Sequence, residues 1–576
     1  MYRQNKRSQQ PLLISNISDL PERTQKYLKH SWAESFRRDV FLRIPEDCFA
    51  VLYDRDPSRP NVPVNILVGL EILKEWRGWS DEELYEHFLF DLQVRYALGC
   101  DDLKEDNFDL RTLYYFRQRM SQYALKENGE NLMKVVFEHI TDEQLKKLEV
   151  KTGMQRMDST QIMSNIADLS RLELSVGVMQ RLYRMLNEAD QARYAAIFQP
   201  YVKEGAGQYS YRIRGKEAVD EHIQRVGEAL SGLLSKLAAD YCEEAVYKMA
   251  QRFFAENFIQ EPTRVRAKSN REITPGCLQS LDDLEATYRV KGNRAYKGYV
   301  ANLTETCDPS NPVQLITHVQ VAPNRTSDIE LLKEAVPALI ERTDLKKLVT
   351  DGGYISPDCD ELLGKNAIEQ IMTALTGTLP DHQDGKLAFS DFNMPMDDHN
   401  TITQATCPAG HAAIAIQPTT GGKGFRLFWN PAQCQTCPFY QKSQCLVHGN
   451  KKGKFFFTVP QERAVSSQRR RRFEQCKKEA RELRPAVEAT VFQVKNPFEN
   501  SKVKVRGLFR TTYVILASAL ATNLRRIFRY ENDRQRGKYT SRKARQTLSA
   551  SFFASCEKLL APFHRLMAHS SVFCGF

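Results

Sequence analysis

The first long pattern in the chain is helical. Apolar residues recur at spacings of three and four through residues 60–150, as in VPVNILVGLEILKEWRGWSDEELYEHF from Val62. Such spacing puts apolar side chains on one face of a helix. Ser80 begins the sequence SDEE, which is typical of a capping box at a helix N-terminus. The helical spacing returns over residues 168–260, so we predict an all-α N-terminal region and a second helical segment.

Patterns typical of strands lie after these helical segments or between them. They are MQRMDSTQIM from Met154, YKGYVANLTETC from Tyr296, VQLITHVQVAP from Val313, LVT from Leu348 and EQIMTAL from Glu369. A helical pattern, DIELLKEAVPALIE, separates the third from the fourth, and another follows Pro357. A run of strands followed by alternating helices and strands predicts a mixed α/β sheet.

The end of the chain combines turn-rich and helical sequence. Residues 376–454 contain many turn residues and four cysteines, and we expect the strand KFFFTVP and a long basic helix from about residue 461 to complete the α/β core. YVILASALATNL from Tyr513 is shorter than the ~20 residues of a membrane span, so it predicts a buried helix. The expected segments are an N-terminal domain (1–150), the first part of the core (151–167 and 286–375), a helical insertion (168–285), a cysteine-containing insertion (376–454), the end of the core (455–530) and a C-terminal tail (531–576).

Composition fits a globular protein, with 42% hydrophobic and 27% charged residues. No apolar segment follows the basic start MYRQNKRSQQ, so we expect neither a signal peptide nor a membrane partner, and a cytoplasmic location. The 13 cysteines then predict reduced thiols rather than a disulfide framework.

The net charge of +11 is concentrated in one block. Residues 461–550 hold 23 Lys and Arg against 8 Asp and Glu, a net of +15, so the rest of the chain sums to −4. Such a block is the electrostatic footprint of a polyanion binder, and we predict nucleic acid as the partner. A solvated basic surface or a protein partner is the alternative.

Three acids are candidates for a metal-dependent site. Asp158 lies in the strand from Met154, and Asp351 ends the strand LVT in KLVTDGGYIS. In RELRPAVEATVFQVK, Glu488 shares one helical stripe about 60° wide with Arg481, Arg484 and Lys495, which invites a phosphate-and-metal interpretation. Each observation also has a plain structural explanation: Asp-Gly is a common turn pair, and Arg484 with Glu488 fits an ordinary i,i+4 ion pair.

Taken together, these motifs resemble the DDE transposases of bacterial insertion sequences, in the IS4-like group. That family carries a helical signature of Tyr, two residues, Arg, three residues, Glu, six residues and Lys. This chain matches it at Arg484, Glu488 and Lys495, while Arg481 stands in the Tyr position, which leaves hairpin formation during excision open. The contexts MDST and TDGGY are also similar to the family, as are the helical stretch from Val62 and RGLFRTTYVILASALATNLRRI. The resemblance covers residues 60–165 and 286–530.

The resemblance implies an RNase H-like core in which Asp158, Asp351 and Glu488 hold two Mg²⁺ or Mn²⁺ ions for phosphoryl transfer on DNA. It implies a transposase that binds the terminal inverted repeats of its own element as a homodimer, cuts there and joins the ends to target DNA. Arg481, Arg484 and Lys495 are then DNA-binding residues, and Gly352 and Gly353 would let the DNA backbone approach Asp351. The alternatives are a non-catalytic DNA-binding protein derived from a transposase, and an RNase H-fold nuclease or resolvase.

Two further sites are weaker hypotheses. In LRTLYYFRQRM, Arg111, Arg117 and Arg119 are candidates for sequence-specific DNA contacts by the N-terminal helices, although a solvated helix face fits equally well. In the cysteine-containing insertion, Cys434 and Cys437 have the spacing of a zinc knuckle. With Cys407 and Cys445 they would form a structural zinc site, because the segment has few large apolar residues to order it.

Overall fold

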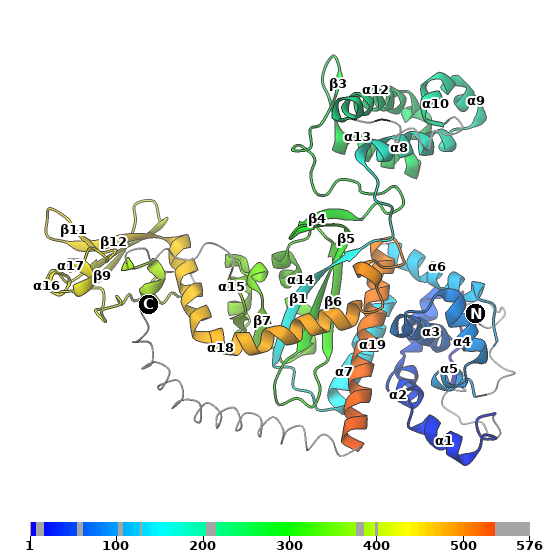
Figure 1. Ribbon diagram of the computed structural model, residues 1–576, viewed down its shortest axis with the longest axis horizontal. Coiled ribbons are helices and arrows are strands. Elements are labelled where there is room, and N and C mark those ends of the chain that lie inside the picture. Colours follow the sequence, from blue (N-terminus) through cyan, green and yellow to red (C-terminus); the bar gives the residue numbers. More distant parts are fainter. Residues whose placement is uncertain are drawn as a thin grey trace, which may run out of the picture.

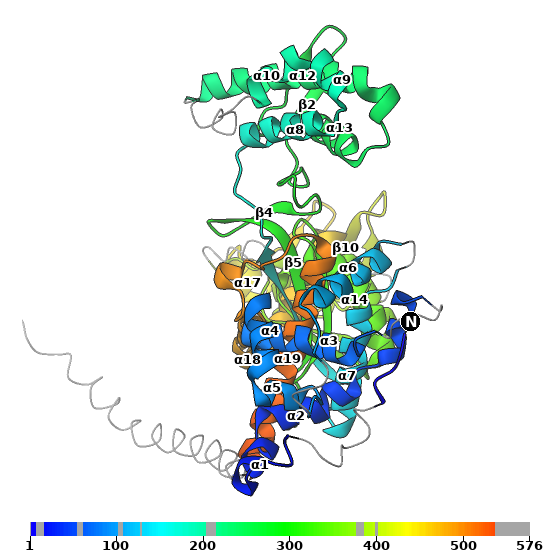
Figure 2. The same ribbon diagram turned by 90° about the vertical axis from the view of Figure 1, so that its right-hand side faces the viewer.

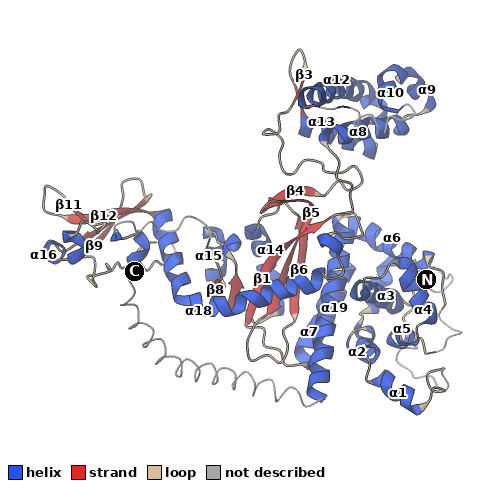
Figure 3. Cartoon of the chain, viewed as in Figure 1, coloured by secondary structure: helices blue, strands red, loops and turns tan. Residues whose placement is uncertain are grey.

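The structure is a computed structural model. It describes residues 2–6, 16–54, 61–101, 107–126, 129–202, 213, 215–375, 385–397 and 401–535, except for the side chains of residues 477–488. The predicted tail beyond residue 535 lies outside this part of the chain. Among the described residues the strands gather in two sheets and one short hairpin, while helices make up most of the remaining regular structure (Figure 3).

The N-terminal region is helical, as predicted. Its α-helices are α1 (Glu22–Lys29), α2 (Trp32–Asp39), α3 (Val64–Arg77), α4 (Asp81–Phe90), α5 (Leu92–Ala97), α6 (Arg111–Leu125) and α7 (Leu132–Lys147). The capping box is confirmed: the Ser80 hydroxyl accepts from the Glu83 N–H, and the Glu83 carboxylate accepts from the Ser80 N–H. This exchange satisfies backbone donors that the first turn of α4 would otherwise leave unpaired.

The large sheet confirms the predicted mixed α/β fold class. Its strands are β1 (Met154–Met163), β4 (Thr287–Lys291), β5 (Arg294–Thr306), β6 (Ile316–Pro323), β7 (Lys347–Thr350) and β8 (Glu369–Met372). The order is β4-β5-β1-β7-β8, and β6 pairs with the later half of β5. β5 is antiparallel to β1, β4 and β6, whereas β1, β7 and β8 are parallel. Parallel neighbours require crossover connections, which here contain helices.

Helices cover both faces of this sheet. On one face, α14 (Asp328–Arg342) and α15 (Pro357–Lys365) share a core with Met157 of β1 and Leu348 of β7. On the other face, α18 (Gln461–Lys495) runs across the strands toward α19 (Leu508–Gln535) (Figure 1). Cys476 of α18 packs there against Val349 of β7. Alternate residues of each strand therefore face different helices.

Helix α19 joins the N-terminal helices to the sheet. Its apolar run is buried, as predicted, in one core with residues of α3, α7, β5 and β6, and Leu520 is fully buried in it. Asn523 docks the helix to the edge of β6, because its amide accepts from the Ile316 N–H at 2.8 Å and donates to the Ile316 carbonyl at 2.9 Å. Within the described ranges, none of the helices combines the length and apolar character needed to cross a membrane.

The segment predicted to be a helical insertion, residues 168–285, has a core of its own. It consists of α8 (Arg171–Met185), α9 (Glu188–Arg193), α10 (Ala195–Val202), α12 (Lys216–Tyr241) and α13 (Ala245–Asn257), with a hairpin of β2 (Phe258–Gln260) and β3 (Val265–Ala267). Leu182, Phe198, Leu230 and Phe253 are buried within it. Figures 1 and 2 show that this unit projects from the end of the large sheet near β4 in both views.

A second sheet corrects one expectation. It contains β9 (Ala415–Pro418), β10 (Gly424–Trp429), β11 (His448–Gly449) and β12 (Phe455–Pro460) in the order β11-β12-β10-β9. The strand KFFFTVP, expected to close the α/β core, is β12 and pairs with β10 instead. The sequence of a short apolar strand does not indicate which strand it pairs with. Its partner β10, GFRLFW, lies in a glycine-rich segment that we predicted to form turns.

The shared core around α19 makes a testable prediction. Leu520→Ala should lower the free energy of unfolding by about 2–5 kcal/mol, because it leaves a cavity in a packed interior. Leu125→Ala is the matched control, since that side chain is 79% exposed at the end of α6 and its loss should change little. Chemical denaturation of the full chain measures both, and equal effects would contradict a stabilising core built around α19.

Candidate active site

Two aspartates lie side by side at the centre of the large sheet. The parallel pairing of β1 with β7 aligns Arg156 with Val349. Asp158 and Asp351 each follow two residues later, so both side chains return to the face of the sheet covered by α18. Asp351 also caps the short helix at Gly352–Tyr354, and its carboxylate accepts from the Gly353 N–H at 2.8 Å. The strands themselves thus position both carboxylates.

The Asp158 carboxylate lies in an environment that disfavours its charge. Its pKa is raised from 3.8 to about 6, first by burial and then by the neighbouring charges of Asp351 and Asp328. Lys291, in the β4–β5 hairpin, and the Ser159 N–H, which donates to the carboxylate at 2.8 Å, oppose it only in part. Like charges placed together in a half-buried site are stabilised when a cation binds between them.

The helix that carries Glu488 crosses the same face. Cys476 of α18 packs against β7, and Thr490 donates to Glu305 of β5. Position 488 lies between these two points on one continuous helix. The side chains of Arg481, Arg484 and Glu488 are outside the described part of the structure, so their proposed roles stay predictions.

Lys495, at the end of α18, is close to Asp158 in the fold. Its ammonium donates to the Thr160 hydroxyl at 3.1 Å and to the Gln161 carbonyl at 3.4 Å, both on β1. Burial lowers its pKa, and the cations Arg294 and Lys291 of the β4–β5 hairpin lower it further. Three cations therefore gather beside the strand of Asp158, and an anion would relieve their repulsion.

Asp328 is a third acid that the sequence analysis missed. The Ser159 hydroxyl donates to its Oδ1 at 2.7 Å, which joins the N-terminus of α14 to the residue after Asp158. A Cβ on Gly353 would lie 2.5 Å from Asp328 Oδ2 and 3.1 Å from Asp351 Oδ1. Gly353 therefore leaves room for a carboxylate, which is a second reason for its small size, and the approach of DNA at this glycine stays a prediction. Asp328 lies in the first turn of α14, directly after the N-cap Ser327, and an acid there is common at any helix N-terminus, so its position in the sequence did not mark it as a site residue.

A buried ionic network supports β1 next to Asp158, on the face of the sheet covered by α18. Glu305 of β5 is 2% exposed and accepts from Arg156 Nε at 2.6 Å and from Arg526 Nη1 at 2.7 Å. Thr490 of α18 also donates to Glu305 and accepts from Arg526 at 2.6 Å. The Glu305 carboxylate thus connects β1, α18 and α19. Its partner on β1, Arg156, lies two residues before Asp158.

The three arginines of α6 have different surroundings. Arg117 donates to Glu71 at 2.7 Å and to both oxygens of Asp81 at 2.7 and 2.6 Å, which ties α6 to α3 and α4. Arg119 is exposed and its guanidinium lies over the ring of Tyr53, 5.0 Å from the centroid. Arg111 is exposed at the start of α6. DNA contact by all three stays a prediction, and the geometry favours the two exposed ones.

The four cysteines share a region that is ordered by apolar packing. Burial, then Cys445, Cys407 and Cys437, raise the pKa of the Cys434 thiol to about 11. Among the described residues, however, no three His, Cys, Asp or Glu side chains are arranged to hold a metal ion. Trp429 is 1% exposed and stacks on Phe457 with centroids 5.1 Å apart. The segment thus has its own apolar core, contrary to expectation, and the structure gives the zinc hypothesis no support.

Two family models match the chain. The model described as Transposase DDE domain matches residues 406–528, which include β10, β12, α18 and most of α19. The model described as Transposase domain (DUF772) matches residues 29–119, which run from the end of α1 into α6. No curated protein and no solved structure matches the chain. The two matches support a DDE transposase, a class of enzyme that binds, cuts and joins DNA.

The environment of Asp158 predicts a pH-dependent stability. Its pKa is higher in the folded protein than in the unfolded chain, so ionising it costs stability as the pH rises from about 4 to 6, by on the order of 2–3 kcal/mol above that range. In EDTA, Asp158→Asn should therefore raise the melting temperature at pH 8, with a gain that shrinks toward pH 4. Asp308→Asn should give no such gain, because hydrogen bonds from Ser310 lower the pKa of Asp308. Thermal unfolding across this pH range measures both.

The ion pairs of Arg117 make a separate prediction. Arg117→Ala should cost about 3 kcal/mol of stability, because it leaves Glu71, whose side chain is 4% exposed, without its cation. Arg111→Ala should leave stability unchanged and serves as the control on the same helix. Urea denaturation compares them, and a neutral result for Arg117→Ala would mean that the network contributes nothing to the fold.

Proposed function

We propose that this chain is a transposase that binds the terminal inverted repeats of its own insertion sequence, cleaves DNA there and transfers the ends to target DNA. The observation that carries the proposal is the placement of Asp158 and Asp351 at matching positions on parallel neighbours β1 and β7, beneath the helix that contains position 488. The two family matches support the same class, one over the N-terminal helices and one over a range that includes α18.

The strand order supports an RNase H-like core. Three antiparallel strands, β6-β5-β1, continue into the parallel strands β7 and β8, and helices cover both faces. Within this proposal, residues 151–167, 286–375 and 461–530 contribute to the core, and the segments 168–285 and 376–454 are insertions. The strand β12, at residues 455–460, belongs to the second sheet. The IS4-like group remains the proposed relationship, on the motif around Glu488.

The donor set fits Mg²⁺ or Mn²⁺. These cations prefer oxygen ligands and often bind through one or two carboxylates together with water and substrate phosphates. Asp158 and Asp351 supply two adjacent carboxylates, and burial followed by the charge of Asp351 raises the pKa of Asp158. Glu488 is proposed as the third ligand. When bound, two such ions supply Lewis acidity for in-line displacement at phosphorus.

The chain's own residues orient this chemistry. The Ser159 hydroxyl donates to Asp328 and holds the middle of β1, while the Gly353 N–H donates to Asp351 and holds the end of β7. Lys495, with Lys291 and Arg294 nearby, would hold a phosphate next to Asp158. Arg481 and Arg484 would extend the phosphate contacts along α18, and the exposed Arg111 and Arg119 would contact the DNA ends. A homodimer on DNA is part of the proposal, since the two ends of an element must be brought together.

Substitution of the acids tests the proposal. We expect Asp351→Asn, Asp158→Asn and Glu488→Gln each to reduce Mg²⁺-dependent nicking of an end-containing duplex by roughly two to three orders of magnitude, because each removes a carboxylate proposed to hold the metal ions. Duplex binding should persist in each variant. Asp358→Asn is the control, since this exposed carboxylate of α15 faces Lys333 and lies in no proposed site.

The outcomes separate the alternatives. Binding without nicking by the unsubstituted chain favours a DNA-binding protein derived from a transposase. Cleavage of branched or RNA-containing duplexes without preference for element ends favours a nuclease or resolvase. Near-normal nicking by Asp351→Asn would contradict the proposed catalytic site.

A further inference from the structure

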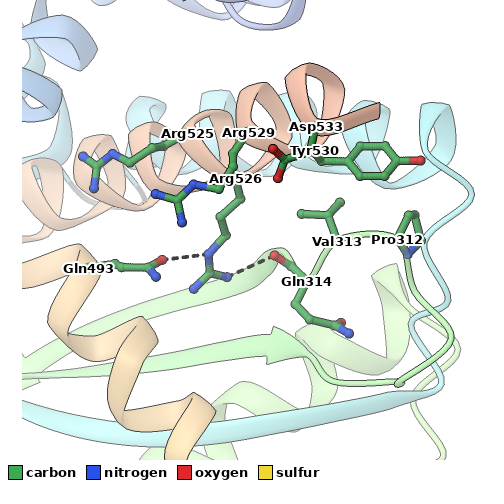
Figure 4. Close-up of a pocket in the computed structure, with 9 residues that line it drawn as sticks. All are labelled: Pro312, Val313, Gln314, Gln493, Arg525, Arg526, Arg529, Tyr530 and Asp533. Carbon is green, nitrogen blue, oxygen red and sulfur yellow. Dashed lines mark hydrogen bonds between the residues drawn. The ribbon is translucent and has the colours of Figure 1, made fainter. Parts of the chain in front are cut away.

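A pocket of about 310 Å³ lies between α19, the end of α18 and the β5–β6 connection (Figure 4). Arg525, Arg526, Arg529 and Asp533 of α19 line it, with Gln493 of α18 and residues 312–314. Three of these side chains are cations and one is an acid. None of these residues belongs to the site proposed for Asp158, Asp351 and Glu488.

The three arginines differ in what holds them. Arg526 is committed to the fold: it donates to Gln493 Oε1 at 2.9 Å and to the Gln314 carbonyl at 3.0 Å, in addition to Glu305. The side chains of Arg525 and Arg529 form no hydrogen bond or ion pair with any residue that the structure describes. They lie one turn apart on α19, so both guanidinium groups can serve one ligand.

Arg525 is surrounded by like charge. It is half-buried, and burial followed by the cations Arg529, Arg77 and Arg526 lowers its pKa. Arg77, at the end of α3, lies over the rings of Trp32 and Trp76 at 4.4 and 4.9 Å from their centroids, so it is held in place. Asp533 is the one acid among the lining residues, and it makes no ion pair with Arg529. A desolvated cation among cations is stabilised by an anion, and a guanidinium presents paired donors that match phosphate oxygens.

The position of the pocket favours a long polyanion. The pocket is lined by residues 312–314 of the connection that follows the end of β5 at Thr306, whereas Lys291 and Arg294 lie at the β4–β5 hairpin, at the other end of β5. Because β5 has 13 residues, the two cationic clusters are separated by up to roughly 40 Å at about 3.3 Å per residue. Asp158 pairs with Leu303 and so lies between them along the strand. One turn of duplex DNA has a similar length, about 34–36 Å, and a free phosphate could not reach both clusters.

We infer that the pocket formed by Arg525 and Arg529 of α19 and Gln493 of α18 binds a backbone phosphate of duplex DNA, at a distance from the catalytic carboxylates. The inference rests on the proposed function, because it takes DNA as the substrate. The pocket holds the duplex on one side of the cleavage site while the Lys291, Arg294 and Lys495 cluster holds it on the other. Arg526 joins the pocket through Glu305 to Arg156, two residues before Asp158, so the phosphate is anchored to the catalytic strand.

Salt-dependent binding tests this site. A labelled random-sequence duplex of 40 base pairs is the probe, because binding to phosphates does not depend on sequence. For Arg525→Gln with Arg529→Gln, the slope of log Kd against log salt should decrease by about 0.9 for each phosphate that the variant no longer neutralises, and affinity at low salt should decrease about tenfold or more. Asp533→Asn should act in the opposite direction and tighten binding. Arg225→Gln with Lys248→Gln removes the same charge from exposed ion pairs of the helical insertion and should leave the slope unchanged.

Each outcome has one meaning. Duplex binding by the unsubstituted chain with an unchanged slope in the double variant overturns this inference and leaves the proposed function standing. No duplex binding by the unsubstituted chain overturns both. Inorganic phosphate is the second probe: if it raises the melting temperature of the unsubstituted chain but not of the double variant, while the duplex slope is the same for both, the pocket takes free phosphate and not DNA. If the double variant does not fold, Arg529→Gln alone provides the same test, because Arg529 is exposed and its substitution should not disturb the fold.

Discussion

The parallel pairing of β1 with β7 is the constraint on which the rest of this structure depends. It brings two carboxylates to neighbouring positions on one face of a sheet, where burial and mutual repulsion raise the pKa of Asp158. Such an arrangement costs folding free energy unless a cation compensates it. The surrounding elements keep it in place: α14 holds the strand after Asp158 through Ser159, and Gly353 leaves space for the Asp328 carboxylate.

The helices α18 and α19 pack on the same face of the sheet as Asp158 and Asp351, and they have two roles. Their apolar residues form a core that runs from the N-terminal helices through α19 to β5 and β6, so the N-terminal helices and the sheet share buried surface. Their polar residues form the network around Glu305, which connects β1, α18 and α19 without leaving that carboxylate unpaired. A displacement of α18 relative to the sheet would therefore disturb the hydrogen bonds that hold the strand of Asp158.

The cations of this protein differ in whether other residues of the chain bind them, and those without such partners are suited to bind an anionic ligand. Arg117 and Arg526 are each held by carboxylates or carbonyls and act within the protein. Arg525 and Arg529 instead lie near other cations and form no hydrogen bond or ion pair with any residue that the structure describes, an arrangement that an anionic partner relieves. This distinction separates arginines of structural importance from those suited to bind a phosphate backbone, which composition alone cannot do.

The sequence by itself determined most of the helices, the main strands of the large sheet, and the placement of Asp158 in one strand and of Asp351 at the end of another. Helical spacing, the capping box at Ser80 and the strand patterns around Asp158 and Asp351 are local properties, and a local pattern suffices to predict them. Tertiary structure alone decided which elements meet. It paired β12 with β10 rather than with the large sheet, gave the cysteine-rich segment a core around Trp429, and placed Asp328 beside Gly353 from a distant helix. These outcomes depend on which surfaces remain to be buried once the chain has folded, and a one-dimensional pattern carries no information about that choice.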